Sequence, residues 1–177
     1  MQGVSLAMIR VIVATVLLAA TAEAQMKLTS PSFEKQQSIP VQHTGAGADA
    51  SPALEWEGAP SSTKSFALIV DDPDAPGQTW VHWVIYNIPA SAIELPEGVA
   101  KSDTVAGMRQ GVNDFGKVGY GGPMPPRGHG KHRYFFKLYA LKSELGLKPR
   151  ATKKQLEDAM KGQILAQTEL VGVYERK

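Results

Sequence analysis

Three apolar runs, each bounded by proline or glycine, constrain the fold of this chain more than any other feature. They are KSFALIVDD at residues 64–72, WVHWVIYNI at residues 80–88 and HRYFFKLYAL at residues 132–141. Their length, their β-branched and aromatic content and their flanking breakers are typical of strands rather than helices. Because all three are apolar on both faces, we expect central strands that are covered on both sides, as in a β-sandwich.

Weaker patterns predict the other elements of a mainly β fold. Strands are expected near residues 27–30, 39–43 and 53–56, and a last strand over residues 169–175 contains Gly172. Thr152 followed by Gln155 is a capping-box pattern. Apolar residues then recur at helical spacing: Leu156, Ala159, Met160 and Ile164. No internal repeat or linker divides the chain, so we predict one domain.

The first 24 residues are typical of a secretory signal. Arg10 precedes the uncharged run VIVATVLLAA, and Ala22-Glu23-Ala24 then places small residues at the spacing that signal peptidase prefers. The run is about half of the ~20 residues that a membrane-spanning helix needs, so an uncleaved anchor is the weaker alternative. We predict a signal peptide over residues 1–24, a domain over residues 25–177, and a periplasmic or secreted location.

Composition and motifs narrow the classes of function. The chain has no cysteine, so stability must come from packing rather than from disulfides. Its net charge is +2 and the charges are scattered, which gives no support for a nucleic-acid partner. The sequence contains no P-loop, no G-x-S-x-G elbow, no H-E-x-x-H helix and no cysteine nucleophile. We therefore predict a protein that is not an enzyme and has no cofactor.

Polar residues gather at the ends of the predicted strands. Asp71 and Asp72 end the first run and Asp74 follows it, where capping of a turn explains carboxylates as well as binding does. Because Pro73 holds the chain extended, the side chains of Asp72 and Asp74 are expected on one side. His82 lies inside the second run, where a histidine is more often a core residue that makes one backbone hydrogen bond.

The third run and the loop before it carry a second polar cluster. The period of two puts His132 and Tyr134 on one face, where imidazole and phenol can donate hydrogen bonds to one anion, while Arg133 points away. The loop over residues 120–130 is either a stiffened connection or a segment whose Gly121 and Gly122 bring main-chain N–H groups to a ligand. The other histidines and the tryptophans are interpreted as surface, loop or core residues: His43, His129, Trp56, Trp80 and Trp83.

The order of these motifs is similar to that of a known family. DDPDAP, HWVIYNIP and YGGPMPPRGHGKHRY resemble the motif blocks of the phosphatidylethanolamine-binding protein (PEBP) family, especially its bacterial, Raf-kinase-inhibitor-like branch. The resemblance extends to SPALEWEGAP at residues 51–60 and to ILAQTELVGVYER at residues 164–176. It implies a PEBP-like sandwich of two antiparallel sheets with a few peripheral helices and a small anion pocket at one end.

The resemblance also implies the pocket residues and the function. The residues that correspond are Asp72, Asp74, His82, Gly122, His132 and Tyr134, with Pro125 and Pro126 at the rim. The leading hypothesis is a non-catalytic exported protein that binds a small anion or a phosphate-bearing ligand. The alternatives are an inhibitor or scaffold that docks a phosphorylated or acidic protein partner and, less favoured, a metal-dependent hydrolase. Bacterial relatives can be dimers, so a homodimer is a further alternative.

Four finer expectations concern this pocket. The tight Asp-Pro-Asp-Ala-Pro turn and the resemblance predict a cis bond between Ala75 and Pro76. Met124 is expected to make the pocket mouth narrower or more apolar. The aspartates are expected to fix imidazole tautomers rather than contact the anion, which they would repel. The imidazoles are expected to gain a proton, and so improve anion affinity, as pH falls through ~6–7.

Overall fold

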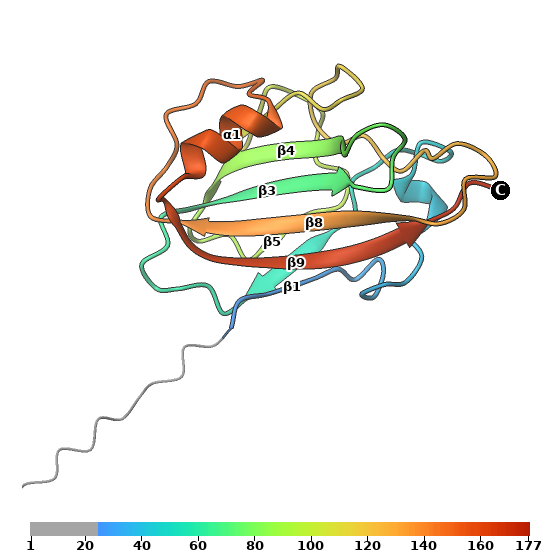
Figure 1. The fold of residues 1–177 in the computed structure, drawn as a ribbon. Coiled ribbons are helices and arrows are strands. Elements are labelled where there is room, and N and C mark those ends of the chain that lie inside the picture. Colours follow the sequence, from blue (N-terminus) through green and yellow to red (C-terminus); the bar gives the residue numbers. More distant parts are fainter. Residues whose placement is uncertain (1–24) are drawn as a thin grey trace, which may run out of the picture.

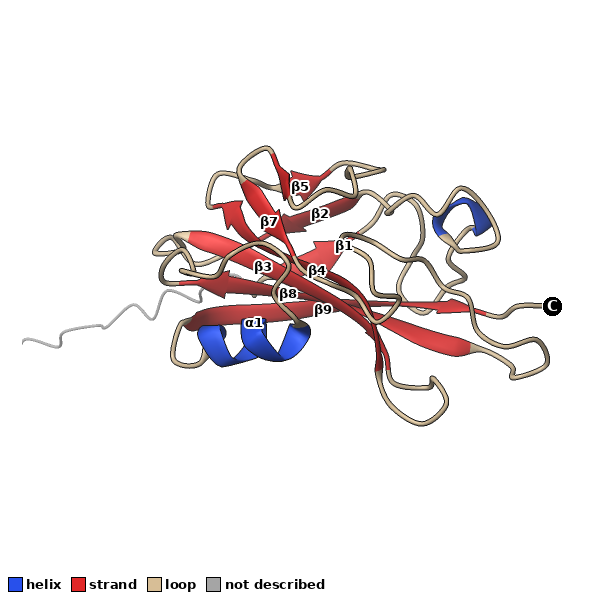
Figure 2. Cartoon of the chain, turned by 90° about the horizontal axis from the view of Figure 1, so that it is seen from above, coloured by secondary structure: helices blue, strands red, loops and turns tan. Residues whose placement is uncertain are grey.

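A computed structural model of the chain describes residues 25–177, so the predicted signal peptide lies outside the described residues. Within them, two antiparallel sheets and a helix form three layers, with the helix on the outer face of the larger sheet (Figures 1 and 2). The larger sheet has the order β6-β7-β4-β3-β8-β9 and the smaller one β1-β2-β5. The predicted mainly β sandwich with peripheral helices is confirmed. No helix in residues 25–177 combines the length and the hydrophobicity needed to cross a bilayer.

The strands are antiparallel and of very different lengths. Those of the larger sheet are β3 Ser65–Asp72, β4 Trp80–Pro89, β6 Thr104–Val105, β7 Met108–Gln110, β8 His132–Leu141 and β9 Ile164–Tyr174. Those of the smaller sheet are β1 Lys27–Thr29, β2 Leu54–Glu57 and β5 Glu94–Leu95. A short 3-10 helix, η1, spans Val41–His43, and α1 spans Lys153–Met160.

The three long apolar runs form interior strands of the larger sheet, as predicted. β3 and β4 are covered on both faces, but the same expectation was wrong for β8, where Arg133 is exposed and Lys137 and Tyr139 are half-buried. β3 pairs with β4 on one side and with β8 on the other, and all eight of its residues are buried. Leu68 and Val70 belong to the core between the two sheets, whereas Ala67 and Ile69 belong to the core beneath α1. Successive side chains of a strand point to opposite faces, so a strand covered on both faces is apolar throughout.

The helix begins as predicted but ends earlier. The Thr152 hydroxyl accepts a hydrogen bond from the Gln155 amide, and the Gln155 side chain accepts one from the Thr152 amide. The helix stops at Met160 because Gly162 adopts a left-handed backbone with φ of 70°. The inclusion of Ile164 in the helical pattern was therefore wrong, since Ile164 opens β9.

The strand predicted over residues 39–43 was also wrong. Ile39 does pair with the end of β9, where its amide donates to the Val173 carbonyl at 2.8 Å. After Pro40 the chain turns into η1, in which the His43 amide donates to the Pro40 carbonyl at 2.9 Å. This segment lies close to β9 because residue 172 is glycine: a Cβ there would lie 2.6 Å from Ile39 Cγ1.

Candidate functional site

The site lies where three strands of the larger sheet meet. β3 ends at Asp72, β4 begins at Trp80, and β8 begins at His132. Asp72 faces Trp80 in the β3–β4 register, and Asp71 faces Phe135 in the β3–β8 register. Because neighbouring strands run in opposite directions, the end of β3 and the starts of β4 and β8 share one edge. The polar strand ends seen in the sequence are thereby brought together.

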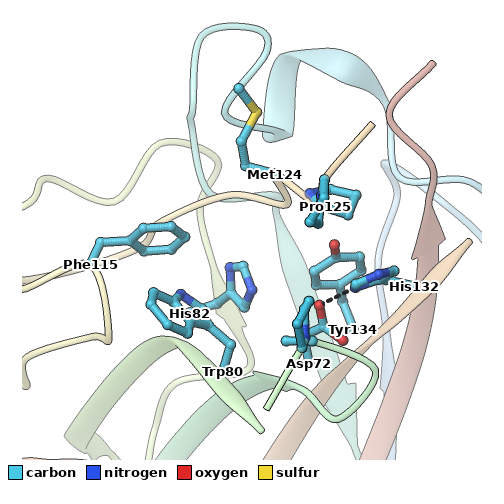
Figure 3. A pocket seen from close by; sticks show the side chains of 11 residues that line it. Asp72, Trp80, His82, Phe115, Met124, Pro125, His132 and Tyr134 are labelled. Atoms are coloured by element: carbon cyan, nitrogen blue, oxygen red, sulfur yellow. Dashed lines mark hydrogen bonds and ion pairs between the residues drawn. The ribbon is translucent and has the colours of Figure 1, made fainter. Parts of the chain in front are cut away.

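A cavity of about 280 Å³ opens at this edge (Figure 3). Its lining residues are Asp72, Ala75, Pro76, Trp80, His82, Phe115, Met124, Pro125, Pro126, His132 and Tyr134. Six of the eight predicted site residues are among them, and Asp74 and Gly122 are not. Met124 and Phe115 are 37% and 40% exposed, so the mouth of the cavity is apolar, as expected for Met124.

One wall is a chain of hydrogen bonds that ends on Asp72. His132 Nδ1 lies 2.7 Å from Asp72 Oδ2, and His132 Nε2 lies 2.8 Å from His129 Nδ1. Asp72 Oδ1 accepts the Asp74 amide at 2.8 Å, so both oxygens of this buried carboxylate are used. A carboxylate accepts, so His132 carries its proton on Nδ1 and its Nε2 faces His129. Both nitrogens of His132 are therefore engaged within the protein.

His82 is fixed in one tautomer by the main chain. Its Nδ1 lies 2.6 Å from the Gly121 carbonyl, which can only accept, so Nδ1 carries the proton. Its Nε2 has no hydrogen-bond partner in the described residues. Burial lowers the pKa of His82 from its ordinary value, against the Gly121 hydrogen bond and the Asp72 charge, which raise it. Burial therefore favours the neutral ring, and it acts against the expected gain of a proton by His82 between pH 6 and 7.

Two buried polar atoms of the cavity residues have no hydrogen-bond partner. They are the Tyr134 hydroxyl and the Trp80 indole nitrogen, and both can donate. Figure 3 shows the Tyr134 hydroxyl at the upper end of its ring, below Pro125 and beside His132. Burial and, after it, the charge of Asp72 raise the pKa of Tyr134, so the phenol keeps its proton. Buried donors without a partner are rare and mark places where a ligand completes the bonding.

Asp74 and Gly122 are directed away from the cavity, for different reasons. The Asp74 amide bonds to Asp72 Oδ1, which turns the chain, and the Asp74 carboxylate then binds the main-chain amide and guanidinium of Arg133 at 2.7–2.9 Å. These hydrogen bonds hold the pKa of Asp74 below its usual value. The expectation that Asp72 and Asp74 project to one side was wrong.

The amides of the glycine pair serve the fold instead of facing a ligand. The Gly121 amide donates to the His82 carbonyl at 2.8 Å, and the Gly122 amide donates to Asp49 Oδ1 at 2.6 Å. The rim residues Pro125 and Pro126 have no N–H to offer. Of the two interpretations of this loop, the structural connection fits these hydrogen bonds, and the one in which Gly121 and Gly122 turn main-chain N–H groups toward a ligand does not.

Sequence reasoning misplaced or missed several residues of this region. His129 is bonded to His132, and Trp80 and Phe115 line the cavity in edge contact with each other at 5.4 Å. His43, interpreted as a surface or loop residue, is fully buried, and its Nδ1 lies 3.0 Å from the Ala50 carbonyl. The GHGKH spacing, with histidines three residues apart beside a strand start, was the one signal for His129.

The geometry can also be compared with the predicted cis bond and with the alternative of a metal-dependent hydrolase. Every peptide bond in residues 25–177 is trans, so the predicted cis bond between Ala75 and Pro76 was wrong. In the same residues, no group of three or more histidine, cysteine, aspartate or glutamate side chains is arranged to hold a metal ion.

Comparison with known proteins gives consistent matches over the described domain. A model of the family described as phosphatidylethanolamine-binding protein matches residues 29–175. A UPF0098 protein of Aquifex aeolicus is 54% identical over 152 residues, which cover 85% of this chain and 89% of that protein. One from Pyrococcus horikoshii is 49% identical over 159 residues, with 88% and 80% covered.

Solved structures agree with these matches. Escherichia coli YbcL, described as a member of the mammalian PEBP family, is 36% identical with a TM-score of 0.81, covering 87% of this chain and 100% of that one. A putative PEBP homologue from Chlamydia trachomatis is 39% identical with a TM-score of 0.79, covering 86% and 99%. The relatives and the solved structures therefore match similar shares of this chain, 85–88%.

Proposed function

Since this chain belongs to the phosphatidylethanolamine-binding protein family, we propose that residues 25–177 form a non-catalytic protein whose cavity binds a small oxyanion or a phosphate-bearing ligand. The observation that carries this proposal is the Tyr134 hydroxyl, which is buried in the cavity wall without a partner. Leaving such a group unpaired costs about 1–3 kcal/mol. An oxyanion supplies the acceptor that this donor lacks.

The bonding of the other polar groups supports recognition rather than catalysis. Asp72 and His132 are two of the three cavity residues with acid–base chemistry, and every polar atom of both side chains is bonded within the protein. The third, His82, keeps a free Nε2 in the described residues, but neither of the other two is placed to act with it as a second acid or base. A general base needs a free lone pair within reach of the proton that it removes. Asp72 and His132 therefore act as a scaffold for the cavity wall.

An inhibitor or scaffold that docks a phosphorylated protein partner is the second candidate. It is favoured by the exposed apolar rim, in which Phe115 and Met124 flank the cavity mouth. Such a rim can pack against apolar residues beside a phosphorylated side chain. Phe115 packs edge-on against His82 at 5.4 Å between ring centroids, so Met124 is the better rim residue to change. We expect Met124→Ala to weaken binding of a phosphopeptide more than that of phosphoethanolamine, which has no apolar residues beside its phosphate.

Calorimetric titration of phosphoethanolamine into the protein tests the proposal. We expect saturable binding at one site per chain, unchanged by a chelator such as EDTA and without release of phosphate. A metal-dependent hydrolase would behave in the opposite way, because the chelator would remove its metal and low pH would protonate its imidazole ligands. Chelator-sensitive binding, or no binding at all, would contradict the proposal.

We further propose export, with cleavage after Ala24. The support is the order of Arg10, the apolar run over residues 11–20 and the Ala22-Glu23-Ala24 site. We expect N-terminal sequencing of protein from the extracytoplasmic fraction to begin at Gln25. The matched control is Ala24→Arg, which removes the small residue before the cleaved bond and should leave the longer precursor. Full-length wild-type chain in the cytoplasmic fraction would reject export.

A further inference from the structure

The free polar atoms of the cavity decide which kind of oxyanion it can accept. This inference rests on the proposed function and makes the ligand more specific. An oxyanion with no proton offers only acceptors, whereas a phosphomonoester monoanion offers acceptors and one P–OH donor. These ligands differ in a hydrogen atom, so a binding site separates them by the balance of its own donors and acceptors.

The cavity contains an acceptor as well as donors. His82 Nδ1–H is committed to the Gly121 carbonyl, so the neutral ring presents an unprotonated Nε2. Figure 3 shows the ring of His82 beside Trp80, opposite Tyr134 and His132. The edge contact of the ring with Tyr134, at 5.1 Å between centroids, holds its orientation. An oxyanion that brings no proton would place an oxygen lone pair against this nitrogen lone pair.

The charges around the cavity disfavour a dianion. Among the described residues that line it there is no lysine or arginine, and Asp72 contributes a buried carboxylate. The nearby cations are engaged outside it, since Arg133 binds Asp74 and Lys137 binds Asp71. A second negative charge on the ligand would enter a poorly solvated site with no fixed cation to offset it.

We propose that the cavity selects the singly protonated form of a phosphomonoester, whose P–OH donates to His82 Nε2 while its other oxygens accept from Tyr134 and Trp80. Two donors and one acceptor on the protein then meet two acceptors and one donor on the ligand. A phosphodiester, which is the phosphate of an intact phospholipid, has no P–OH and is a poor ligand. Sulfate and sulfate monoesters are rejected for the same reason.

Three small ligands of equal charge test the role of the ligand proton. At pH 5 methyl phosphate, methyl sulfate and dimethyl phosphate each carry one negative charge, because the second pKa of a phosphomonoester is about 6. Only methyl phosphate then has an acidic O–H. We expect calorimetry at pH 5 to show that methyl phosphate binds about tenfold to a hundredfold more tightly than the other two, the range for an unpaired polar group in a site.

A rise in pH should remove this advantage. Between pH 5 and pH 8 the monoanion fraction of methyl phosphate falls about a hundredfold, and its affinity should fall by about the same factor. The ionisable groups around His82 are Asp71, Asp72, Asp114 and Tyr134, with His132 and His129 on the opposite wall. Methyl sulfate has no proton to lose in this range and is the control. Any change of its affinity with pH comes from ionisable groups of the protein.

Two variants separate the acceptor from the donor. His82→Phe removes the acceptor, so the ratio of methyl phosphate to methyl sulfate affinity should fall to within about threefold of one. Tyr134→Phe removes a donor that any oxyanion uses, so it should weaken all three ligands and leave the ratio unchanged. The wild-type ratio tests the inference even if His82→Phe does not fold.

The outcomes distinguish this inference from the proposed function. Equal affinity of methyl phosphate and methyl sulfate at pH 5 would overturn the protonated-ligand inference and leave oxyanion binding intact. No binding of any of the three would overturn both. A capped phosphoserine peptide shares the monoester chemistry. If the peptide binds as tightly as methyl phosphate, the phosphomonoester that the cavity selects belongs to a protein partner. If the peptide binds more weakly, the ligand is a free small phosphomonoester.

Discussion

Replacing Gly122 with alanine is expected to lower the free energy of unfolding by about 3 kcal/mol. A Cβ at this position would lie 2.5 Å from the His43 carbonyl oxygen and 2.7 Å from Thr44 Cα, both of which are backbone atoms. Neither the His43 carbonyl nor the backbone at Gly122 can easily move. The Tyr120 hydroxyl donates to the His43 carbonyl at 2.7 Å, and the Gly122 amide donates to Asp49 Oδ1 at 2.6 Å. The strain must therefore separate the loop over residues 120–130 from residues 43–44.

Gly146→Ala is the matched control for this prediction. A Cβ at Gly146 would meet no atom within 4 Å, and its backbone is outside the left-handed region. This substitution should be neutral or stabilise the protein by about 0.4–1 kcal/mol, because it restricts the unfolded chain. Urea unfolding of both variants measures the difference. Equal stabilities would show that the loop does not pack as closely as the structure has it.

Tyr134→Phe is expected to weaken oxyanion binding by about 1.5–3 kcal/mol, the worth of a hydrogen bond to a charged group. The same change should not destabilise the free protein. Its hydroxyl is buried without a partner, so its removal deletes an unsatisfied polar group rather than a hydrogen bond. A residue that loses binding and keeps or gains stability when truncated serves the ligand rather than the fold.

Tyr120→Phe makes the identical chemical change at a second buried tyrosine. The Tyr120 hydroxyl donates to the His43 carbonyl at 2.7 Å, and Tyr120 does not line the cavity. We expect it to cost about 1–2 kcal/mol of stability and to leave methyl phosphate affinity within about twofold of wild type. Thermal unfolding gives the stability of each of the two variants, and calorimetry gives the methyl phosphate affinity of each. Loss of stability at Tyr134 with unchanged binding would show that its hydroxyl is structural.

Local patterns in the sequence predicted much of the fold. The three strands β3, β4 and β8 follow from apolar runs with breakers at their ends, and the capping box places the start of α1. The alternation along β8 also predicts that His132 and Tyr134 are buried while Arg133 is exposed. These features depend on neighbours a few residues away, which a single sequence displays directly.

The rest of the site depends on partners far apart in the chain. Asp74 turns outward because Arg133, 59 residues later, binds it, and the Gly122 amide is taken by Asp49, 73 residues earlier. Phe115 reaches the cavity from a loop whose position no local pattern predicts. Periodicity indicates which face a strand residue occupies, but it does not indicate which hydrogen-bond donors remain free after folding. In the folded protein the Tyr134 hydroxyl has no partner within the described residues, whereas both ring nitrogens of His132 are bonded within the protein.

The most direct test of the central claim is a crystal structure of residues 25–177 with methyl phosphate at pH 5. The account predicts a phosphate group inside the cavity, with one oxygen within about 3 Å of Tyr134 Oη and another within about 3 Å of His82 Nε2. The hydrogen bond between His82 Nδ1 and the Gly121 carbonyl should remain. Methyl phosphate bound elsewhere, or held in this cavity through a metal ion, would contradict the account.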